Sequence, residues 1–422
     1  MPDRRLQFDI VIVGAGPAGL AAACAASECG RKAALLESAP WIGGQIWRGE
    51  EAHFANTQAR YWINRVRKSG ATLLTGTNVI AANTPITLLA EQPHGAVEIQ
   101  WRKLILATGA RELFLPFPGW TLPGVFGPGG LQGLVKNGWP VAGKKVVIAG
   151  TGPLLLAAAD GLKKHGARVV LIAEQTRKSH VAELGLTLLA YPGKVLQGAA
   201  LKARLLGVPQ RYGVWPVRAL GSDHVRVVEL TNGRDTWTEN CDQLACGFHL
   251  VPNVELPITF GCDLRNGFVK VDHWQMTSVA DVFCAGEPTA IGGVNAALVE
   301  GQIAGYAASG QLEKAERLFS QRATHQTFAQ ALDKTYALRD ELKGITTDDT
   351  IFCRCEDVTF ARVKQHRFGR EAKLQTRCGM GICQGRICGA AAKIILGWEQ
   401  SSVRPPVHPA RINSLTTHNQ AH

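Results

Sequence analysis

The side chains best suited to chemistry in this sequence are cysteines gathered near its C-terminal end. The chain has 422 residues and 11 cysteines, and five of the cysteines lie between positions 353 and 388. They form the strings Cys353-Arg-Cys355 and Cys378-Gly-Met-Gly-Ile-Cys383-Gln-Gly-Arg-Ile-Cys388. Thiolates at this density, without the even spacing of a secreted disulfide scaffold, usually bind metal. The intervening arginines offset negative charge and the glycines let backbone N–H groups approach the sulfurs, so we expect an iron–sulfur centre.

The spacing Cys-x-Cys followed by Cys-x4-Cys resembles the iron–sulfur module of bacterioferritin-associated ferredoxins. This resemblance implies a [2Fe–2S] cluster in a small, mostly helical module, with a helix over residues 390–396 whose dipole favours the anionic cluster. Five thiols compete for four positions. We expect the metal ligands to be Cys353, Cys355, Cys383 and Cys388, with Cys378 as the alternate. A structural zinc site and unligated thiols remain the alternatives.

The N-terminal segment indicates a different chemistry, the binding of a dinucleotide. An apolar run over residues 8–13 leads into Gly14-Ala-Gly-Pro-Ala-Gly19, an alanine-rich stretch follows, and a second apolar run ends at Glu37. Strand, G-x-G-x-x-G turn, helix, strand and acid occur at the spacing of a dinucleotide-binding βαβ unit. In such a unit Gly14 makes the tight turn, Gly16 admits the pyrophosphate, Gly19 permits close helix packing, and Glu37 accepts hydrogen bonds from the ribose. The alternative is an ordinary βαβ unit with a glycine turn.

A second unit of the same kind begins at Lys145. An apolar run leads into Gly150-Thr-Gly152-Pro-Leu-Leu155, and a later apolar run ends at Glu174. Leu155 stands where the motif has Gly or Ala, so the helix cannot pack as closely on its strand, although both glycines can still approach a phosphate. Glu174 favours a ribose with a free 2′-hydroxyl. The segment predicts either a nicotinamide or adenine nucleotide site, for NAD or ATP, or a relic fold that binds nothing.

Three further segments resemble the two-dinucleotide-domain flavoproteins, the group of thioredoxin reductase and glutathione reductase. They are Trp41-Ile-Gly-Gly-Gln45, the strand and turn over residues 104–110, and the segment 277–287, which ends in Gly286-Glu287. The resemblance implies FAD at the N-terminal site, with Glu287 in place of the aspartate of that group. The implied FAD-binding residues are Gly14, Gly16, Pro17, Ala18, Gly19, Glu37, Gly44, Gln45, Thr108, Gly109, Gly286 and Glu287.

The same resemblance implies the fold class and the order of the domains. We expect an α/β protein, a two-dinucleotide-binding-domain flavoprotein of the glutathione/thioredoxin reductase type, with a small helical C-terminal iron–sulfur domain. The expected segments are an FAD-binding domain (1–140 and 250–310), a second nucleotide-binding domain (141–249), a helical connector (311–349), a [2Fe–2S] domain (350–398) and a basic, proline-containing tail (399–422).

The other cysteines exclude one activity of that group. No cysteine lies between Cys29 and Cys241, whereas the disulfide reductases carry a redox pair either just after the first ribose acid or inside the second nucleotide domain. We therefore do not expect a dithiol reductase of those types. The cysteines expected to be ordinary core residues are Cys24, Cys29, Cys241, Cys246, Cys262 and Cys284.

Composition limits the partners and the location. The formal net charge of +12 favours anionic ligands or an acidic partner surface. No basic stripe with interleaved aromatics points to nucleic acid, and no apolar run is long enough for a transmembrane segment. Arg4-Arg5 before an apolar run imitates a twin-arginine export signal, but that run is the first strand of the nucleotide fold. We expect a cytoplasmic protein, and any association with a membrane would be through partners.

The ordered motifs resemble one family over nearly the whole chain, from about Phe8 to Leu415. The motifs are Gly43-Gly-Gln-Ile-Trp-Arg48, Cys353-Arg-Cys-Glu-Asp-Val-Thr359 and Thr376-Arg-Cys-Gly-Met-Gly-Ile-Cys-Gln-Gly-Arg-Ile-Cys388. They are similar to those of the flavin-binding α-type subunits of opine oxidase, hydrogen cyanide synthase and D-hydroxyproline dehydrogenase. The resemblance implies an FAD- and [2Fe–2S]-containing electron-transfer subunit of a multi-subunit, dye-linked dehydrogenase. Such an enzyme acts on the C–N bond of an amino acid, imino acid or opine. The implied partners are an oxidase-like flavoprotein β subunit and a small ferredoxin-like subunit.

Two other functions remain open from the sequence. One is a stand-alone NAD(P)H-dependent FAD oxidoreductase that feeds its own iron–sulfur centre. The other is a scaffold subunit that uses nucleotide binding only for assembly. The histidines are scattered along the chain, and a lone histidine is usually a surface or core residue, so we name no catalytic acid or base.

Overall fold

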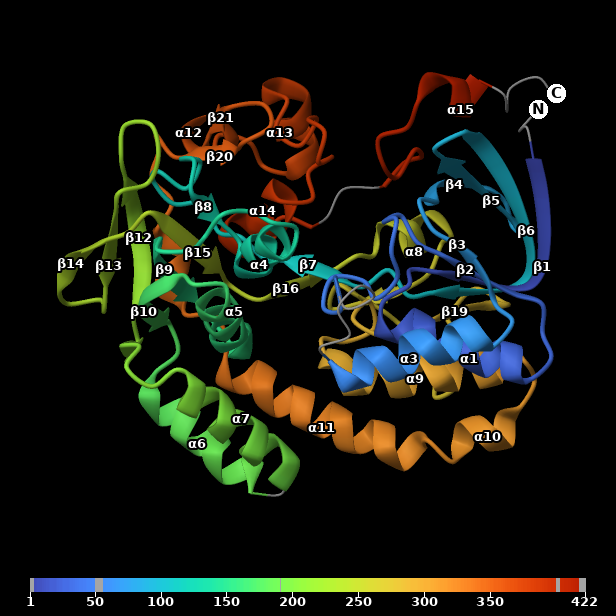
Figure 1. Cartoon of the computed structure of the whole chain (residues 1–422). Helices are drawn as coiled ribbons and strands as arrows, with labels where there is room; N and C mark the ends of the chain where they lie inside the picture. Colours follow the sequence, from blue (N-terminus) through green and yellow to red (C-terminus); the bar gives the residue numbers. More distant parts are fainter. Residues whose placement is uncertain (1–3, 50–55, 190, 400–402, 417–422) are drawn as a thin grey trace. The chain divides into compact units, whose positions relative to one another are not determined.

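The chain folds into two compact units. The computed structural model describes residues 4–49, 56–189, 191–399 and 403–416, and Figure 1 shows their course. Unit 1 comprises residues 1–111, 252–329 and 402–422, and unit 2 comprises residues 112–251 and 330–401.

A seven-stranded sheet forms the centre of unit 1. Its order is β3-β2-β1-β6-β5-β4, with β19 parallel to the end of β6. β1 runs parallel to β2 and β6, whereas β4, β5 and β6 are antiparallel neighbours. The strands are β1 (Arg4–Val13), β2 (Ala33–Leu36), β3 (Thr72–Leu74), β4 (Asn78–Thr84), β5 (Thr87–Gln92), β6 (Gly95–Leu106) and β19 (Val282–Cys284).

Three helices lie together against this sheet: α1 (Pro17–Glu28), α3 (Thr57–Lys68) and α9 (Gly293–Ala308) (Figure 1). The alanine-rich α1 is buried from Ala18 to Ala26, because its small side chains let elements approach it on several sides. A Cβ added to Gly301 of α9 would lie 2.1 Å from the backbone oxygen of Ala18. The two helices therefore meet backbone to backbone, and only glycine fits at that point.

The remaining elements of unit 1 are short. They are α8 (Glu255–Thr259), β17 (Leu264–Arg265), β18 (Phe268–Val269), α10 (Leu312–Glu316) and α15 (Ile412–Thr416). Helix α11 (Phe319–Thr335) and the paired strands β7 (Ala110–Glu112) and β16 (Leu250–Pro252) each include residues of both units.

A five-stranded parallel sheet in the order β11-β10-β9-β15-β8 forms the centre of unit 2. A three-stranded antiparallel sheet, β12-β13-β14, accompanies it. The elements are β8 (Val125–Phe126), α4 (Pro128–Lys136), β9 (Lys145–Gly150), α5 (Pro153–Lys164), β10 (Arg168–Glu174), α6 (Lys178–Leu188), α7 (Pro192–Arg204), β11 (Gln210–Tyr212), β12 (Trp215–Leu220), β13 (Val227–Thr231), β14 (Thr236–Asn240) and β15 (Gln243–Gly247).

The cysteine-rich segment is also part of unit 2. Its elements are η1 (Asp340–Gly344), β20 (Ile351–Cys353), β21 (Val358–Thr359), α12 (Phe360–Val363), α13 (Gly369–Thr376) and α14 (Cys388–Leu396). The indole N–H of Trp120 donates to the backbone oxygen of Ile351 at 2.5 Å, and Ile394 and Ile395 of α14 pack against the apolar core around the second sheet. The helix expected over residues 390–396 is present, two residues longer at its start.

The observed division of the chain differs from the expected domain boundaries. The sequence placed the first break after residue 140, but residues 112–140 lie in unit 2, because β8 pairs with β15 and α4 packs on α5. The expected connector 311–349 is divided between the units inside α11. The described part of the C-terminal tail belongs to unit 1, where Arg411 donates to the Glu91 carboxylate.

No helix within the described ranges is both long and apolar enough to cross a membrane.

A carboxyl group is buried beside the turn that follows strand β19 of the first sheet. Glu300 of α9 is 2% exposed, and its Oε2 accepts hydrogen bonds from the Gly286 N–H at 2.9 Å and the Thr289 hydroxyl at 3.0 Å. Burial raises the pKa of Glu300 from 4.5 to about 7, against the opposing effect of these hydrogen bonds. The folded state therefore holds a proton on this group at pH values where the unfolded chain has lost it.

This difference predicts a pH dependence of stability. A folded-state pKa above the unfolded one means that the free energy of unfolding falls as pH rises from about 4.5 to about 7, by roughly 3 kcal/mol. We expect Glu300→Gln to flatten this part of the pH profile, measured by denaturant unfolding. Glu316→Gln, on the exposed surface of α10, is the control. A profile for Glu300→Gln as steep as that of the wild type would show that another group is responsible.

Candidate functional site

The first glycine turn has the geometry of a pyrophosphate cradle. Gly14 has a φ of +104°, and a Cβ there would lie 2.3 Å from the backbone oxygen of Ala107. A Cβ on Gly19 would lie 1.8 Å from the oxygen of Gly14. A Cβ on Gly16, in contrast, would meet nothing within 4 Å. Packing requires the first and third glycines, whereas the second faces open space at the N-terminus of α1, where an anion is favoured.

Glu37 lies at the carboxyl end of β2, beside this turn. Its Oε2 accepts from the Ala15 N–H at 2.9 Å, and its Oε1 accepts from the Ala39 N–H at 2.9 Å. The carboxylate is half-buried, so two backbone donors fix it next to the turn while leaving it partly accessible. This is the position expected for an acid that receives the ribose hydroxyls.

Two distant segments complete the cradle. A Cβ on Gly44 would lie 2.9 Å from the Cα of Gly16, and a Cβ on Gly286 would lie 2.9 Å from the Cβ of Ala18. Glu287 accepts from the Gly293 N–H at 3.0 Å, at the start of α9. The structure thus brings the expected glycines of three segments together, and the open space before Gly16 fits the pyrophosphate of FAD.

The other expected FAD residues lie at the edge of this cradle. The Thr108 hydroxyl donates to the Asn253 oxygen at 2.6 Å, and Gly109 follows with a φ of +71°. The Gln45 side-chain oxygen accepts from Arg48 at 2.7 Å on an exposed surface.

Sequence reasoning missed Glu300, which lies beside Gly286, because a single acid in an apolar helix gives no signal of the hydrogen bonds that it makes.

The second glycine turn is built in the same way, but its acid is buried. A Cβ on Gly150 would lie 1.7 Å from the Gly247 oxygen, while Gly152 faces open space. Glu174, 6% exposed, accepts from the Thr151 hydroxyl at 2.9 Å and from the Gly152 N–H at 2.8 Å. The contact with Gly152 matches that of Glu37 with Ala15, but Glu174 is buried whereas Glu37 is half-buried, so the predicted ribose-binding carboxylate of the second turn is the less accessible of the two.

Residues that follow α11 cover this acid. The Gln175 side-chain nitrogen donates to the Thr151 hydroxyl at 3.0 Å and to the Ala337 oxygen at 3.1 Å. The Tyr336 side chain is buried, and its pKa is raised by burial and by the nearby Glu174. A ribose must displace this segment to reach Glu174, which favours the expectation that the second fold binds no dinucleotide.

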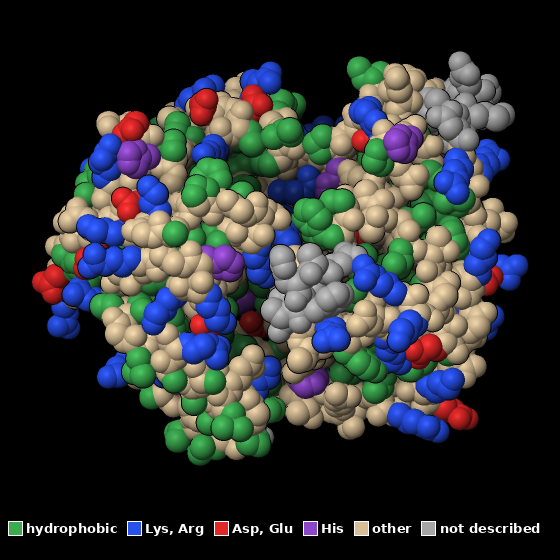
Figure 2. Space-filling view, in the orientation of Figure 1, with side chains coloured by type: hydrophobic (Ala, Val, Ile, Leu, Met, Phe, Trp, Pro, Cys, Tyr) green, Lys and Arg blue, Asp and Glu red, His purple; other side chains and the backbone are tan. Residues whose placement is uncertain are grey.

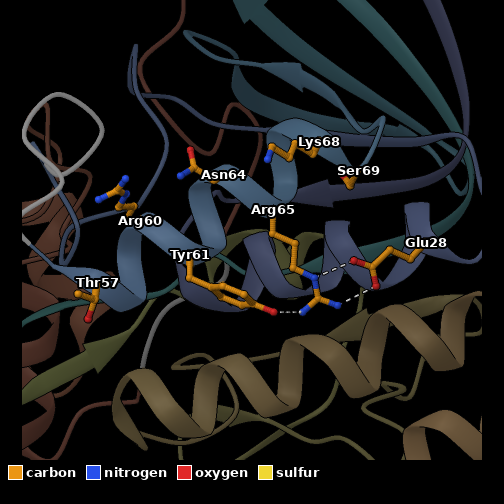
Figure 3. A pocket seen from close by; sticks show the side chains of 8 residues that line it. All are labelled: Glu28, Thr57, Arg60, Tyr61, Asn64, Arg65, Lys68 and Ser69. Carbon is orange, nitrogen blue, oxygen red and sulfur yellow. Dashed lines mark hydrogen bonds and ion pairs between the residues drawn. The ribbon is translucent and has the colours of Figure 1, made fainter.

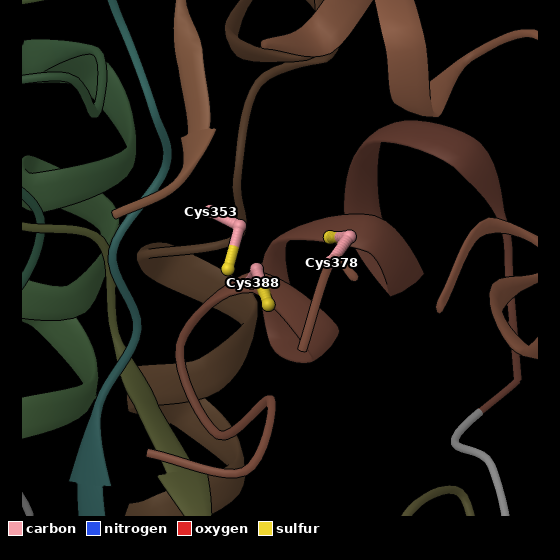
Figure 4. A group of neighbouring side chains, drawn as sticks. All are labelled: Cys353, Cys378 and Cys388. Atoms are coloured by element: carbon pink, nitrogen blue, oxygen red, sulfur yellow. The ribbon is translucent and has the colours of Figure 1, made fainter. Parts of the chain in front are cut away.

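The five clustered cysteines come together in the folded chain. The sulfurs of Cys353, Cys378 and Cys388 all lie within 4.8 Å of one another (Figure 4). The Gly379 N–H points at the Cys353 sulfur, 3.4 Å away. Hydrogen bonds from Cys378 and Cys388 lower the pKa of the Cys353 thiol. Cys355 lies within hydrogen-bonding reach of Cys383.

A cavity of about 280 Å³ adjoins these thiols within unit 2. Its walls include the aromatic side chains Phe114, Trp120, Phe126 and Phe352. The cysteines that line it are Cys353, Cys355, Cys383 and Cys388, the four expected as ligands. Cys378, the expected alternate, is in the three-sulfur group but not among the lining residues. A dense set of soft thiol donors around one space fits a thiolate-bound metal centre, either iron–sulfur or zinc.

A larger open cavity, of about 630 Å³, lies along α3 and is shown in Figure 3. Arg65 donates to both oxygens of Glu28 at 2.7 Å and to the Tyr61 hydroxyl at 3.2 Å. No residue of the glycine turn lines this cavity, so it is not part of the cradle.

Of the six expected core cysteines, five are buried and Cys29 is partly exposed.

Residues 8–304 match the family model described as pyridine nucleotide-disulphide oxidoreductase. The chain belongs to this family. Hydrogen cyanide synthase subunit HcnB of Pseudomonas protegens is 31% identical over 91% of this chain and 90% of its own length. The A-type opine oxidase subunit of Agrobacterium tumefaciens is 28% identical over 97% of this chain and 91% of its own length. The resemblance inferred from the sequence motifs is confirmed.

Solved structures show the same fold. L-proline dehydrogenase from P. horikoshii superposes with a TM-score of 0.69 at 20% identity, over 98% of this chain and 80% of its own. Thioredoxin reductase from T. acidophilum superposes with a TM-score of 0.51 at 22% identity, over 75% of this chain and 99% of its own. The chain is an oxidoreductase with an FAD-binding fold, and the expected fold class is confirmed.

The cradle predicts the effect of one substitution. Gly16→Val places a branched side chain where the pyrophosphate must approach, while the Gly16 φ of −73° and its open surroundings leave the fold intact. We expect FAD per chain to fall at least about tenfold, with a circular dichroism spectrum like that of the wild type. Gly193→Val is the matched control, because Gly193 of α7 also faces open space. Stoichiometric FAD in Gly16→Val would disprove the assignment.

The buried acid of the second turn predicts a poor reaction with NADH. Because Glu174 is buried and hydrogen-bonded to the Thr151 hydroxyl, we expect flavin reduction by NADH to be far slower than milliseconds. Stopped-flow absorbance of the oxidised protein mixed with NADH measures this rate, and dithionite reduction of the same sample is the positive control. Complete bleaching within milliseconds would instead favour a stand-alone NADH-dependent reductase.

Proposed function

We propose that the chain is the FAD- and [2Fe–2S]-containing electron-transfer subunit of a multi-subunit dehydrogenase that oxidises the C–N bond of an amino acid, imino acid or opine. One observation carries the proposal: a pyrophosphate cradle and a five-cysteine group occur on the same chain. Relatives that align over nearly the whole chain are named as subunits of hydrogen cyanide synthase and opine oxidase.

The first site is proposed to bind FAD through its backbone. Gly16 offers open space and the helix N-terminus to the pyrophosphate, Glu37 the ribose acceptor, and Gly286 a close backbone approach. FAD, when bound, accepts electrons in pairs and releases them singly. Glu300 holds the Gly286 N–H and so fixes the turn that faces the cofactor. The proposed second nucleotide at Gly150, Gly152 and Glu174, NAD or ATP, binds only if the 335–337 segment moves.

The proposed cluster ligands are Cys353, Cys355, Cys383 and Cys388. These four thiols line one cavity, although they come from two strings separated in the sequence. Thiolate ligands also suit zinc, so metal analysis decides between the two. Arg354 lines the same cavity and offsets the charge of the thiolates.

The proposed partners are an oxidase-like flavoprotein β subunit, which oxidises the amine, and a small ferredoxin-like subunit. The support is that the relatives are themselves named as subunits of larger enzymes. The co-expression test uses this chain together with an oxidase-like flavoprotein. The pair should reduce a dye with an amino acid, imino acid or opine, whereas the chain alone should not. Rapid NADH-dependent dye reduction by the chain alone would contradict the subunit role.

Cysteine variants test the proposed ligands. Changing Cys355 to Ser should remove most of the iron and acid-labile sulfide and loosen the cysteine module, because ligation and folding are coupled in small metal modules. FAD content should be unchanged, since the cradle is built from unit 1. Cys378→Ser is the matched control and should keep the cluster. Zinc in the native protein would contradict the electron-transfer role, and loss of iron in Cys378→Ser with Cys388→Ser unaffected would reverse the ligand choice.

A further inference from the structure

Two large apolar side chains are exposed on the loop that carries the cysteines. Ile382 is 78% exposed and Met380 is 40% exposed, between Cys378 and Cys383. Single exposed apolar residues are common on protein surfaces. Two on one short loop, next to the clustered thiols, form an apolar centre of the kind found at protein interfaces.

This loop lies directly on an exposed thiol. A Cβ added to Gly381 would lie 2.2 Å from the Cβ of Cys355 and 3.3 Å from its sulfur. The backbone between Met380 and Ile382 therefore packs on Cys355, which is itself exposed. The two apolar side chains therefore flank the glycine that packs on the exposed Cys355.

The cysteine-rich segment as a whole is basic. Between residues 350 and 398 there are nine Lys and Arg side chains and three Asp and Glu side chains, a difference of +6, which is half of the net charge of the chain. Arg354 and Arg377 are exposed beside Cys355 and Cys378, and Arg377 pairs with Glu356 at 2.7 Å. Over the module, at the upper left of Figure 2, blue basic and green apolar side chains lie next to one another.

We propose that the face formed by Arg354, Cys355, Arg377, Met380 and Ile382, the cysteine-loop face, docks an acidic electron-carrier protein. The apolar side chains exclude water at the contact, and the arginines attract and orient the acidic surface. The redox step rests on the proposed function: a cluster held by these cysteines would give one electron to the oxidised centre of the partner, with no covalent bond formed or broken.

Pairing of this face with the same face of a second copy is disfavoured, since both would carry the same basic charge. A second exposed apolar surface lies on α6 and α7, where green side chains gather at the lower left of Figure 2, with Leu186, Leu189 and Leu196 each 72% exposed. It is distinct from the cysteine-loop face. Leu206, 77% exposed just after α7, supplies a control residue matched to Ile382 in exposure.

Binding of a plant-type [2Fe–2S] ferredoxin, a small acidic protein, tests the proposal. Titration calorimetry should show binding by the full chain that weakens about tenfold when salt rises from about 50 to about 300 mM. Ile382→Asp places a negative charge in the apolar centre and should weaken binding at least about tenfold, whereas Leu206→Asp should change it less than about twofold. Basic cytochrome c should bind neither the wild-type chain nor the variants Ile382→Asp and Leu206→Asp.

Three results would overturn the proposal. They are no binding of the ferredoxin by the wild type at low salt, equal binding by Ile382→Asp and Leu206→Asp, or binding to vesicles of anionic phosphatidylserine without binding to the ferredoxin. The readout is association rather than activity. If the native protein contains no iron but binds the ferredoxin through this face, the electron-transfer role is refuted and the docking face is supported. Failure of the proposed function and failure of the docking face therefore give different results.

Discussion

The close approach of α1 to its neighbours is the constraint on which the first site depends. Gly19 meets the oxygen of Gly14, and Gly301 of α9 meets the oxygen of Ala18, at distances that exclude any side chain. These contacts hold the N-terminus of α1 against the end of the sheet, so that the turn at Gly16 faces open space. Of the three glycines in the motif, packing already fixes Gly14 and Gly19, so Gly16 is the one left to serve a ligand.

The second unit shows what the same turn becomes when its surroundings change. Gly150 again meets a backbone oxygen, that of Gly247. Here, however, the acid at the end of the second strand is buried, and the segment after α11 hydrogen-bonds to Gln175 beside it. Unit 2 instead supports the cysteine module, because Trp120 and the core of the second sheet pack against it. The same kind of turn is thus paired with a half-buried acid in unit 1 and with a buried acid in unit 2.

Local motifs in the sequence predicted much of this, because glycine turns and cysteine strings are short and their chemistry is specific. The positions of Gly14, Gly16, Gly19 and Glu37 in one cradle followed from spacing alone. The break after Arg111 did not, because it depends on β8 pairing with a strand more than a hundred residues later. The engagement of Glu174 by Thr151 and the cover provided by residues 335–337 are also long-range contacts that spacing does not show.

The central claim is that one chain holds both a flavin and a thiolate-bound iron–sulfur centre. An anaerobic reductive titration of the purified chain, followed by visible absorbance and electron paramagnetic resonance, tests it most directly. The account predicts uptake of about three electrons per chain, two by FAD and one by a [2Fe–2S] cluster, with the resonance signal of a reduced cluster. Uptake of about two electrons, with flavin bleaching and no cluster signal, would contradict it.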